Sequence, residues 1–292
     1  MTTLASTDIA APTSTGRRRP RLNPRITISG GFLAIVAITA IFAPLIAPHS
    51  YGDMVGRPLA GLGLLGTDDY GRDIFSRLIY AGRVSLSVSV AAVLIAGVVG
   101  TALGLVAGYV RGWTETVIMR GIDVMLSFPT IVLAVAAVAA LGSGLSILVG
   151  VIGVLYIPRF ARVVYGSALS VRANDYVLAA RAMGAGPVRI MAGTILPNIL
   201  APIVVQASLS LSFAIQVESG LSFLGLGAQP PLPSWGSMVS AGRDFLAVQP
   251  VLLIAPALVI AAVVLALNVL GDGLRDSLDP QRTTKTKKKG NA

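Results

Sequence analysis

The 292-residue sequence contains no cysteine, which excludes disulfide bonds and thiolate metal sites and leaves the redox compartment open. Charged residues are also scarce, at 12% of the chain against 54% hydrophobic residues. Such a composition is typical of an integral membrane protein, and the length accommodates about six helical spans of ~20 residues with their loops. The sequence therefore predicts an all-α integral membrane protein.

Residues that common catalytic motifs require are missing or misplaced. All four lysines lie within residues 285–289, so no glycine-rich loop with a lysine at the start of a helix can hold a nucleotide phosphate. The only glutamates are Glu115 and Glu218, and no H-E-x-x-H or G-x-S-x-G pattern occurs. The single histidine, His49, is better explained as a hydrogen-bonded or solvated residue than as a ligand. We therefore expect no catalytic residue, no metal site and no cofactor bound by this chain; any ATP must be hydrolysed by another subunit.

The formal net charge of +10 comes from residues that cluster in two tails and in the loops between apolar segments. No basic stripe alternates with aromatic residues, so nucleic acid is not an expected partner. The distribution instead fits the positive-inside rule and predicts that both termini are cytoplasmic. Residues 1–24 and 281–292 are predicted to be disordered basic tails.

Apolar segments predict six membrane spans within residues 25–280, at about 26–47, 85–109, 120–141, 145–164, 199–224 and 248–270. In the second span, Gly100, Gly104 and Gly108 recur at every fourth residue, on one helix face. Small residues at this spacing let another helix backbone approach closely, either within the chain or across a dimer.

The third and fourth spans contain two features with local structural explanations. Asp123 lies one helical turn from Arg120 and is expected to pair with it. Pro158 is expected to kink the end of the fourth span, and Arg159 and Arg162 then mark the inner membrane interface.

The fifth span is the most polar of the six. Six polar residues recur on two adjacent faces: Ser208, Ser212, Gln216 and Ser219 on one face, and Gln206 and Ser210 on the other. Such a stripe normally faces protein or water, so it either lines a translocation path or forms hydrogen bonds between helices. The candidates for a path are Gln206, Ser208, Ser212, Gln216 and Glu218. A functional or gating role is favoured for Glu218. The alternative is a carboxylate at the membrane interface that reaches water.

Residues 48–83, between the first two spans, are polar, and their arginines are balanced by aspartates. Dense Gly-Thr-Asp and Gly-Arg-Asp turns predict a folded outer loop with internal ion pairs, for which a structural role is favoured over a functional one.

Residues 174–197, NDYVLAARAMGAGPVRIMAGTILP, mix charge into a helical pattern between two apolar spans. The pattern predicts a short helix over 176–183, with Asn174 or Asp175 as its N-cap and Gly184 where it ends. Pro187 then begins a new helix that runs into the next span. The result is a helical hairpin.

Small residues on this hairpin, Ala179, Ala180 and Gly184, allow another protein surface to approach closely. An ordinary basic cytoplasmic loop is the alternative explanation of this segment taken alone.

Four strings, in order along the chain, resemble one family, the C-type permease subunits of dipeptide/oligopeptide ABC importers. They are LGTD…GRD…SR, DYVLAARAMGA, LSFLGLGAQPP…PSWG and NVLGDGLRDSLDP, and the resemblance covers nearly everything after residue 30. The hairpin resembles the family's "EAA" loop at Ala179, Ala180, Gly184, Leu196 and Pro197. The departures are Leu178 in place of Glu, Thr194 in place of Ile, Ile157 in place of Trp, and Gly186 in place of Ser.

The resemblance implies a six-span permease of the bacterial plasma (inner) membrane, surrounded by lipid. Its partners would be a homologous second permease subunit, two ABC ATPase subunits or domains that use ATP, and an extracytoplasmic substrate-binding protein. The hairpin would sit in a groove on the ATPase and couple ATP-driven movements to alternating access. The residues expected to take part in this coupling are Arg172, Asp175, Tyr176, Ala179, Ala180, Gly184 and Pro197. Leu178 in place of Glu suggests docking through apolar contact more than through charge.

Short peptides are the expected substrates, by resemblance alone. Nickel, glutathione-like peptides and other small solutes stay open, because selectivity in such systems belongs largely to the binding protein. A secondary transporter or channel is the competing class. It would favour ionisable residues near the bilayer middle and an internal repeat, whereas few such charges and no repeat are found.

Overall fold

The structure is a computed structural model that describes residues 24–61 and 63–278. The predicted disordered tails, 1–24 and 281–292, lie outside the described residues except for Pro24. The described residues contain helices and loops but no strand, and the only β pairing among them is two isolated bridges, Met54 with Arg72 and Thr67 with Asp73. The predicted all-α membrane fold is confirmed.

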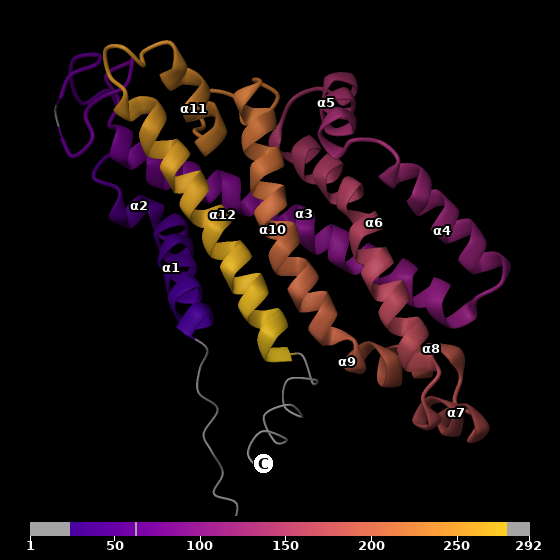
Figure 1. Cartoon of the computed structure of the whole chain (residues 1–292). Helices are drawn as coiled ribbons and strands as arrows, with labels where there is room; N and C mark the ends of the chain where they lie inside the picture. Colours follow the sequence, from indigo (N-terminus) through magenta and orange to yellow (C-terminus); the bar gives the residue numbers. More distant parts are fainter. Residues whose placement is uncertain (1–23, 62, 279–292) are drawn as a thin grey trace, which may run out of the picture.

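Five helices are long and apolar enough to cross a membrane, and one bent pair forms a sixth candidate span (Figure 1). The five are α1 (Pro24–Ile41), α3 (Ile74–Val110), α6 (Leu145–Arg172), α10 (Leu200–Phe223) and α12 (Val251–Leu278). The bent pair is α4 (Trp113–Leu126) and α5 (Thr130–Leu141). The shorter helices are α2 (Ala43–Ile46), α7 (Asp175–Ala182), α8 (Pro187–Ile190), the π-helical turn η1 (Met191–Ile195), α9 (Leu196–Asn198) and α11 (Trp235–Arg243).

The third predicted span, 120–141, differs from the single helix that we expected. It is divided into α4 and α5, whose axes meet at 88°. Pro129 lies at the break, and a proline disfavours helical backbone at the residue before it, here Phe128. The sequence pattern predicted the apolar length of this span but not the bend between α4 and α5.

Three helices are longer than the predicted spans, and one of them, α12, continues past residue 270 to Leu278. α3 begins eleven residues before residue 85, at Ile74, and α6 continues through Pro158 to Arg172. Pro158 therefore lies in the middle of α6, and the expectation that it kinks the end of the helix is wrong.

The contact between α3 and α6 is the most extensive between any two helices. The glycine face of α3 explains it: a Cβ atom at Gly100 would lie 2.7 Å from the carbonyl oxygen of Ile157, and one at Gly104 would lie 2.6 Å from that of Ala161. The predicted close approach at these glycines is confirmed, and it occurs within the chain.

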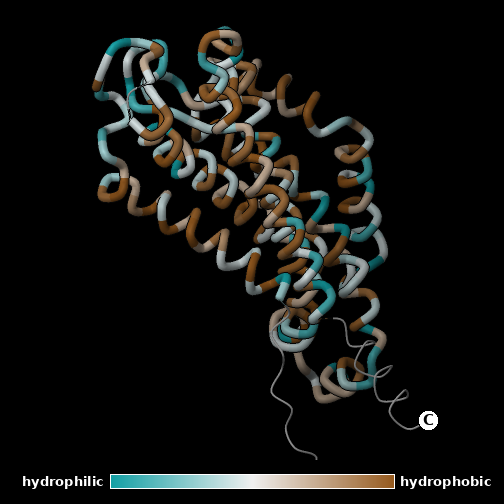
Figure 2. Tube along the Cα trace, turned by 60° about the vertical axis from the view of Figure 1, so that its left-hand side comes forward, coloured by the Kyte–Doolittle hydropathy of each residue, from teal (hydrophilic) through white to brown (hydrophobic). Residues whose placement is uncertain are grey.

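The bundle has two distinct ends (Figure 1). The loop end carries residues 48–73 and α11, and the hairpin end carries α7 to α9 together with the start of α1 and the end of α12. Hydrophilic positions gather in the loops at one end and around the hairpin at the other (Figure 2). α12 packs against α10 and α1, so the first and last helices lie side by side.

Candidate functional site

The hairpin at residues 174–198 forms as its sequence predicts. α7 begins at Asp175 after an extended Asn174, although the Asn174 side chain makes no capping hydrogen bond. The chain turns at Gly184, whose φ of +81° is a conformation that other residues rarely adopt. α8 begins with Pro187, but the helix then loosens into the π-helical turn η1, which the sequence did not predict.

The hairpin is fixed to the bundle by a small apolar cluster. Its fully buried members are Val177, Ile190 and Ile195 from the hairpin, Ile199 directly after it, and Val164 and Ala168 from α6. Leu105 and Tyr109 from α3 join them. The guanidinium groups of Arg172 and Arg181 lie 5.9 and 5.3 Å from the centre of the Tyr109 ring. The hairpin therefore has a fixed orientation relative to α3 and α6.

The outer surface of the hairpin exposes apolar side chains. Met183 is 82% exposed and Val188 73%, and Leu178 and Tyr176 are about half exposed. Sequence reasoning singled out Tyr176 and Leu178 among these, and it missed Met183, Val188 and the buried anchors Val177 and Ile190. The apolar spacing along the hairpin was the signal that could have found them.

The other predicted coupling residues lie around this surface. Asp175, Ala179, Gly184 and Pro197 are exposed, and Ala180 and Arg172 are half-buried. The structure brings Arg172 and residues 175–184 together, while Pro197 lies in α9 beyond the π-helical turn. Their role in coupling stays a prediction.

The polar stripe of α10 divides into two groups. Ser208 and Ser212 are buried and donate hydrogen bonds to the carbonyl oxygens of Leu267 (3.1 Å) and Val264 (3.4 Å) on α12. Ser208 and Ser212 thus form hydrogen bonds between helices, which was the alternative to lining a translocation path.

Two glutamines of the stripe lie in different surroundings from these serines. Gln206 is half-buried and donates to the hydroxyl of Ser210 at 2.9 Å. Gln216 is exposed, although its amide donates to the carbonyl oxygen of Ser212 at 3.3 Å. Gln216 is thus the predicted path residue that is most available to a solute.

Glu218 is fully buried, so the suggestion that its carboxylate reaches water at an interface is wrong. Its carboxylate accepts hydrogen bonds from the hydroxyls of Ser222 (2.8 Å) and Ser219 (3.4 Å). Both donors are neutral. Within residues 24–61 and 63–278, no basic side chain forms an ion pair with Glu218.

The predicted span boundaries placed Arg159 at the inner end of the fourth span, and the structure corrects this position. It lies near the midpoint of the 28-residue α6 rather than at the end of a span. Its guanidinium lies 4.8 Å from the ring centres of both Tyr156 and Phe213, which joins α6 to α10 through cation–π contacts. The described residues offer it no carboxylate within ion-pair distance.

Asp123, in contrast, has an ion-pair partner, but not the expected one. It binds the guanidinium of Arg162 on α6, and the prediction of a pair with Arg120 is wrong. The partner is close in space because α4 packs beside α6.

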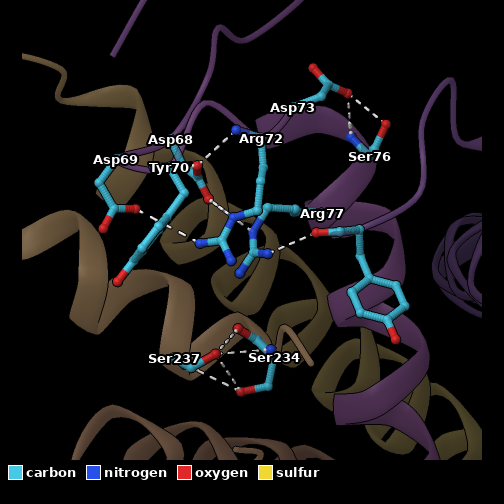
Figure 3. Close-up of polar contacts among 10 residues, drawn as sticks. Asp68, Asp69, Tyr70, Arg72, Asp73, Ser76, Arg77, Ser234 and Ser237 are labelled. Atoms are coloured by element: carbon cyan, nitrogen blue, oxygen red, sulfur yellow. Dashed lines mark hydrogen bonds and ion pairs between the residues drawn. The ribbon is translucent and has the colours of Figure 1, made fainter. Parts of the chain in front are cut away.

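The loop end contains the ion pairs that the sequence predicted (Figure 3). The buried Asp68 carboxylate accepts hydrogen bonds from the Nε atom of Arg72 (2.7 Å) and from the backbone amides of Tyr70 and Arg72, and it forms an ion pair with the Nε atom of Arg77 at 3.3 Å. Asp73 caps α3 by accepting from the amide of Ser76 at 2.8 Å. Burial, with the charge of the adjacent Asp68, raises the pKa of the Asp69 carboxyl above its usual 3.8.

Comparison with known proteins identifies sequence relatives over most of the chain. The family described as "Binding-protein-dependent transport system inner membrane component" matches residues 100–284. The dipeptide transport system permease protein DppC of Alkalihalophilus pseudofirmus is 45% identical over 84% of this chain and 82% of its own length. The glutathione transport system permease protein GsiD of Pectobacterium atrosepticum is 40% identical over 89% and 88%.

A solved structure shares the fold. The MetNI methionine ABC transporter, in an inward-facing conformation, contains a chain that superposes with a TM-score of 0.58. The match covers 69% of this chain and 96% of that one, at 18% sequence identity, so it concerns the fold alone.

Proposed function

This chain belongs to the family of binding-protein-dependent transport system inner membrane components, and we propose that it is the permease subunit of an ATP-driven importer for short peptides. The relatives named for dipeptide and glutathione transport support peptides as the substrate class. The observation that carries the proposal is the hairpin: a rigidly anchored helical turn that presents apolar side chains away from the bundle.

In this proposal the hairpin end faces the cytoplasm and binds an ABC ATPase subunit. Met183, Val188 and Leu178 would enter a groove on that subunit, because burial of exposed apolar surface favours association. The buried cluster around Val177 and Ile190 would transmit the movement of the ATPase to α3 and α6 without deforming the hairpin. A second permease, a second ATPase and an extracytoplasmic binding protein at the loop end would complete the importer, and ATP would bind only to the ATPases.

The proposed translocation path runs along the exposed face where α6 meets α10. Gln216, Phe213 and Arg159 lie on this face. A guanidinium near the middle of a membrane helix is costly unless it meets water, a substrate or protein groups, so this face is the favoured one for a solute. Ser208 and Ser212 would instead hold α10 to α12.

The docking proposal is tested by placing charge on the hairpin surface. The double variant Leu178→Asp with Met183→Asp should lose its co-purifying ATPase and its ATP-driven peptide uptake. The change places two unpaired charges in an apolar contact, and loss of one hot-spot residue of an interface already costs about 2 kcal/mol or more. A matched control, Leu64→Asp with Val248→Asp, changes two exposed apolar residues outside the hairpin and should keep both. Retention of the ATPase by the hairpin variant would reject the docking site.

The path proposal can use the absence of cysteine, because each introduced thiol is then unique. Gln216→Cys should react with a membrane-impermeant thiol reagent, and peptide should slow the reaction. Ser212→Cys, one turn away and packed on α12, should react far more slowly. Equal labelling of the two positions would reject the proposal that Gln216 lines the path while Ser212 packs against α12.

Glutathione-like peptides are the second candidate substrate, favoured by the GsiD relative. Competition between a dipeptide and glutathione for uptake by the purified importer distinguishes the two. Uptake by this chain in liposomes without ATP or any partner would instead identify a secondary transporter or channel.

A further inference from the structure

An apolar groove of about 460 Å³ opens between α1, α3, α10 and α12. Its walls include Leu33, Val36 and Ala37 from α1, Leu86 from α3, Leu211 from α10 and Leu267 from α12. Because the groove ends near Ala40 and Ile41 of α1, it reaches toward the loop end of the bundle. Its shape and lining suit a hydrocarbon chain.

Three polar side chains of α3, Arg83, Ser87 and Ser89, interrupt this apolar lining. Arg83 is exposed at the groove and forms no ion pair with any part of the chain that the structure describes. Ser89 is fully buried and also lines the groove, yet its hydroxyl finds no hydrogen-bond partner among the described residues. A buried hydroxyl without a partner is costly, so an acceptor supplied by a ligand would stabilise the site.

Ser87, between them, provides the contrast. Its hydroxyl lines the same groove but already donates to the carbonyl oxygen of Val84 at 3.0 Å. Among the described residues that line the groove, Ser89 is therefore the buried polar group without a hydrogen-bond partner, and Arg83 is the charged group without an ion pair.

We propose that this groove binds an anionic phospholipid. Its phosphate would pair with Arg83, its ester carbonyl would accept a hydrogen bond from Ser89, and one acyl chain would lie along the walls formed by α1 and α12. The six residues from Arg83 to Ser89 rise about 9 Å along α3, and the long Arg83 side chain can shorten this span toward a glycerol backbone.

Other occupants fit the groove less well. A free phosphate would leave the apolar walls unfilled. Phosphatidylcholine carries the same phosphate, but its quaternary ammonium group cancels that charge, so its net attraction to Arg83 is weaker than that of an anionic lipid. A helix of a partner permease could accept from Ser89 through a backbone carbonyl, as α12 accepts from Ser208 and Ser212, but a carbonyl leaves the Arg83 charge without a counter-ion. The proposal does not depend on which solute is transported.

The test uses the full chain, purified with the subunits that accompany it, and native mass spectrometry. Phosphatidylglycerol should be retained over phosphatidylcholine with the same acyl chains, and Arg83→Gln should reduce that preference about fivefold, as for one arginine near an anionic headgroup. Arg243→Gln, at an exposed arginine of α11 paired with Asp244, should change nothing. Equal retention of the two lipids, or equal behaviour of the two arginine variants, would overturn the proposal.

The serines supply a second, independent comparison. Ser89→Ala should lower retention of both lipids by about two- to fivefold because it removes the unpaired donor, while Ser87→Ala should leave retention unchanged. A photoreactive group attached at Ser87→Cys then identifies the occupant directly. Cross-linking to phosphatidylglycerol supports the lipid site, and cross-linking to a neighbouring protein subunit rejects it.

Discussion

The two ends of the bundle differ in which side chains they bury and which they expose. At the loop end, charged groups are buried and find their partners within the chain, as Asp68 does with Arg72 and Arg77. At the hairpin end, apolar groups such as Met183 and Val188 are exposed on a frame whose own anchors are buried. A self-contained end needs no other protein to be stable, whereas the hairpin end has surface that a partner would cover. Substitutions at the loop end should therefore alter the stability of the chain, and substitutions on the exposed surface of the hairpin end should alter assembly with a partner.

The largest effect on stability is expected for Asp68→Ala. The change leaves Arg72 and Arg77, whose side chains are only 14% and 11% exposed, without their shared carboxylate, and it removes the acceptor of two backbone amides. It should lower the free energy of unfolding by about 3–5 kcal/mol. Thermal unfolding of the purified protein measures this loss. Asp244→Ala breaks an exposed pair and is the control, with an expected loss of about 1 kcal/mol or less. Similar losses for the two variants would mean that the loop end is not held by its ion pairs.

Sequence pattern predicted the parts of the fold that depend on composition and local residue preference. The apolar segments predicted the long helices, Gly184 and Pro187 predicted the hairpin turn, and the balanced charges of residues 48–83 predicted internal ion pairs. Each of these signals is contained in a short stretch of sequence.

Features that depend on neighbours far along the chain could not be predicted in this way. Asp123 binds Arg162 rather than Arg120 because α4 packs on α6, and that packing is invisible in a local pattern. The burial of Glu218 likewise follows from the packing of α10 against α11 and its other neighbours. Local spacing finds elements and turns, but the partners of a charged group depend on tertiary packing.

An intermediate effect is expected for Ile190→Ala in the hairpin. Removing a fully buried isoleucine typically costs about 2–4 kcal/mol, and here the cost should fall on the hairpin rather than on the bundle. Hydrogen exchange should show faster amide exchange over residues 175–199 with unchanged protection of α3 and α6. Val188→Ala, two residues away and largely exposed, is the control and should leave exchange unaltered. Loss of protection throughout α3 and α6 would show that the hairpin is part of the core.

A smaller effect is expected for Glu218→Gln. The hydrogen-bond partners of Glu218 are neutral serine hydroxyls, which can accept from an amide as well as donate to its oxygen. We therefore expect a change of about 1 kcal/mol in the free energy of unfolding, well below that of Asp68→Ala. Glu218→Leu, which removes every hydrogen-bonding atom of the side chain, should cost more than Glu218→Gln. A glutamine variant as unstable as Asp68→Ala would reveal that the charge of Glu218, rather than its shape and hydrogen bonds, is required.

The smallest effect, Asp69→Asn, separates burial from ion pairing at the loop end. Burial and the neighbouring charge of Asp68 raise the pKa of Asp69 in the folded protein, so its contribution to stability is fully present below pH 3.8 and is lost as the pH rises through the raised pKa. The variant should therefore be slightly more stable than the native chain at neutral pH, by about 0.5 kcal/mol or less, and the difference should close on acidification. Melting temperatures of both proteins between pH 3.5 and pH 7 (roughly the window in which the carboxyl titrates) provide the measurement. A variant that is less stable than the native chain at neutral pH would show that the 3.9 Å contact with Arg72 outweighs burial, and it would make Asp69 a member of the ion-pair network around Asp68.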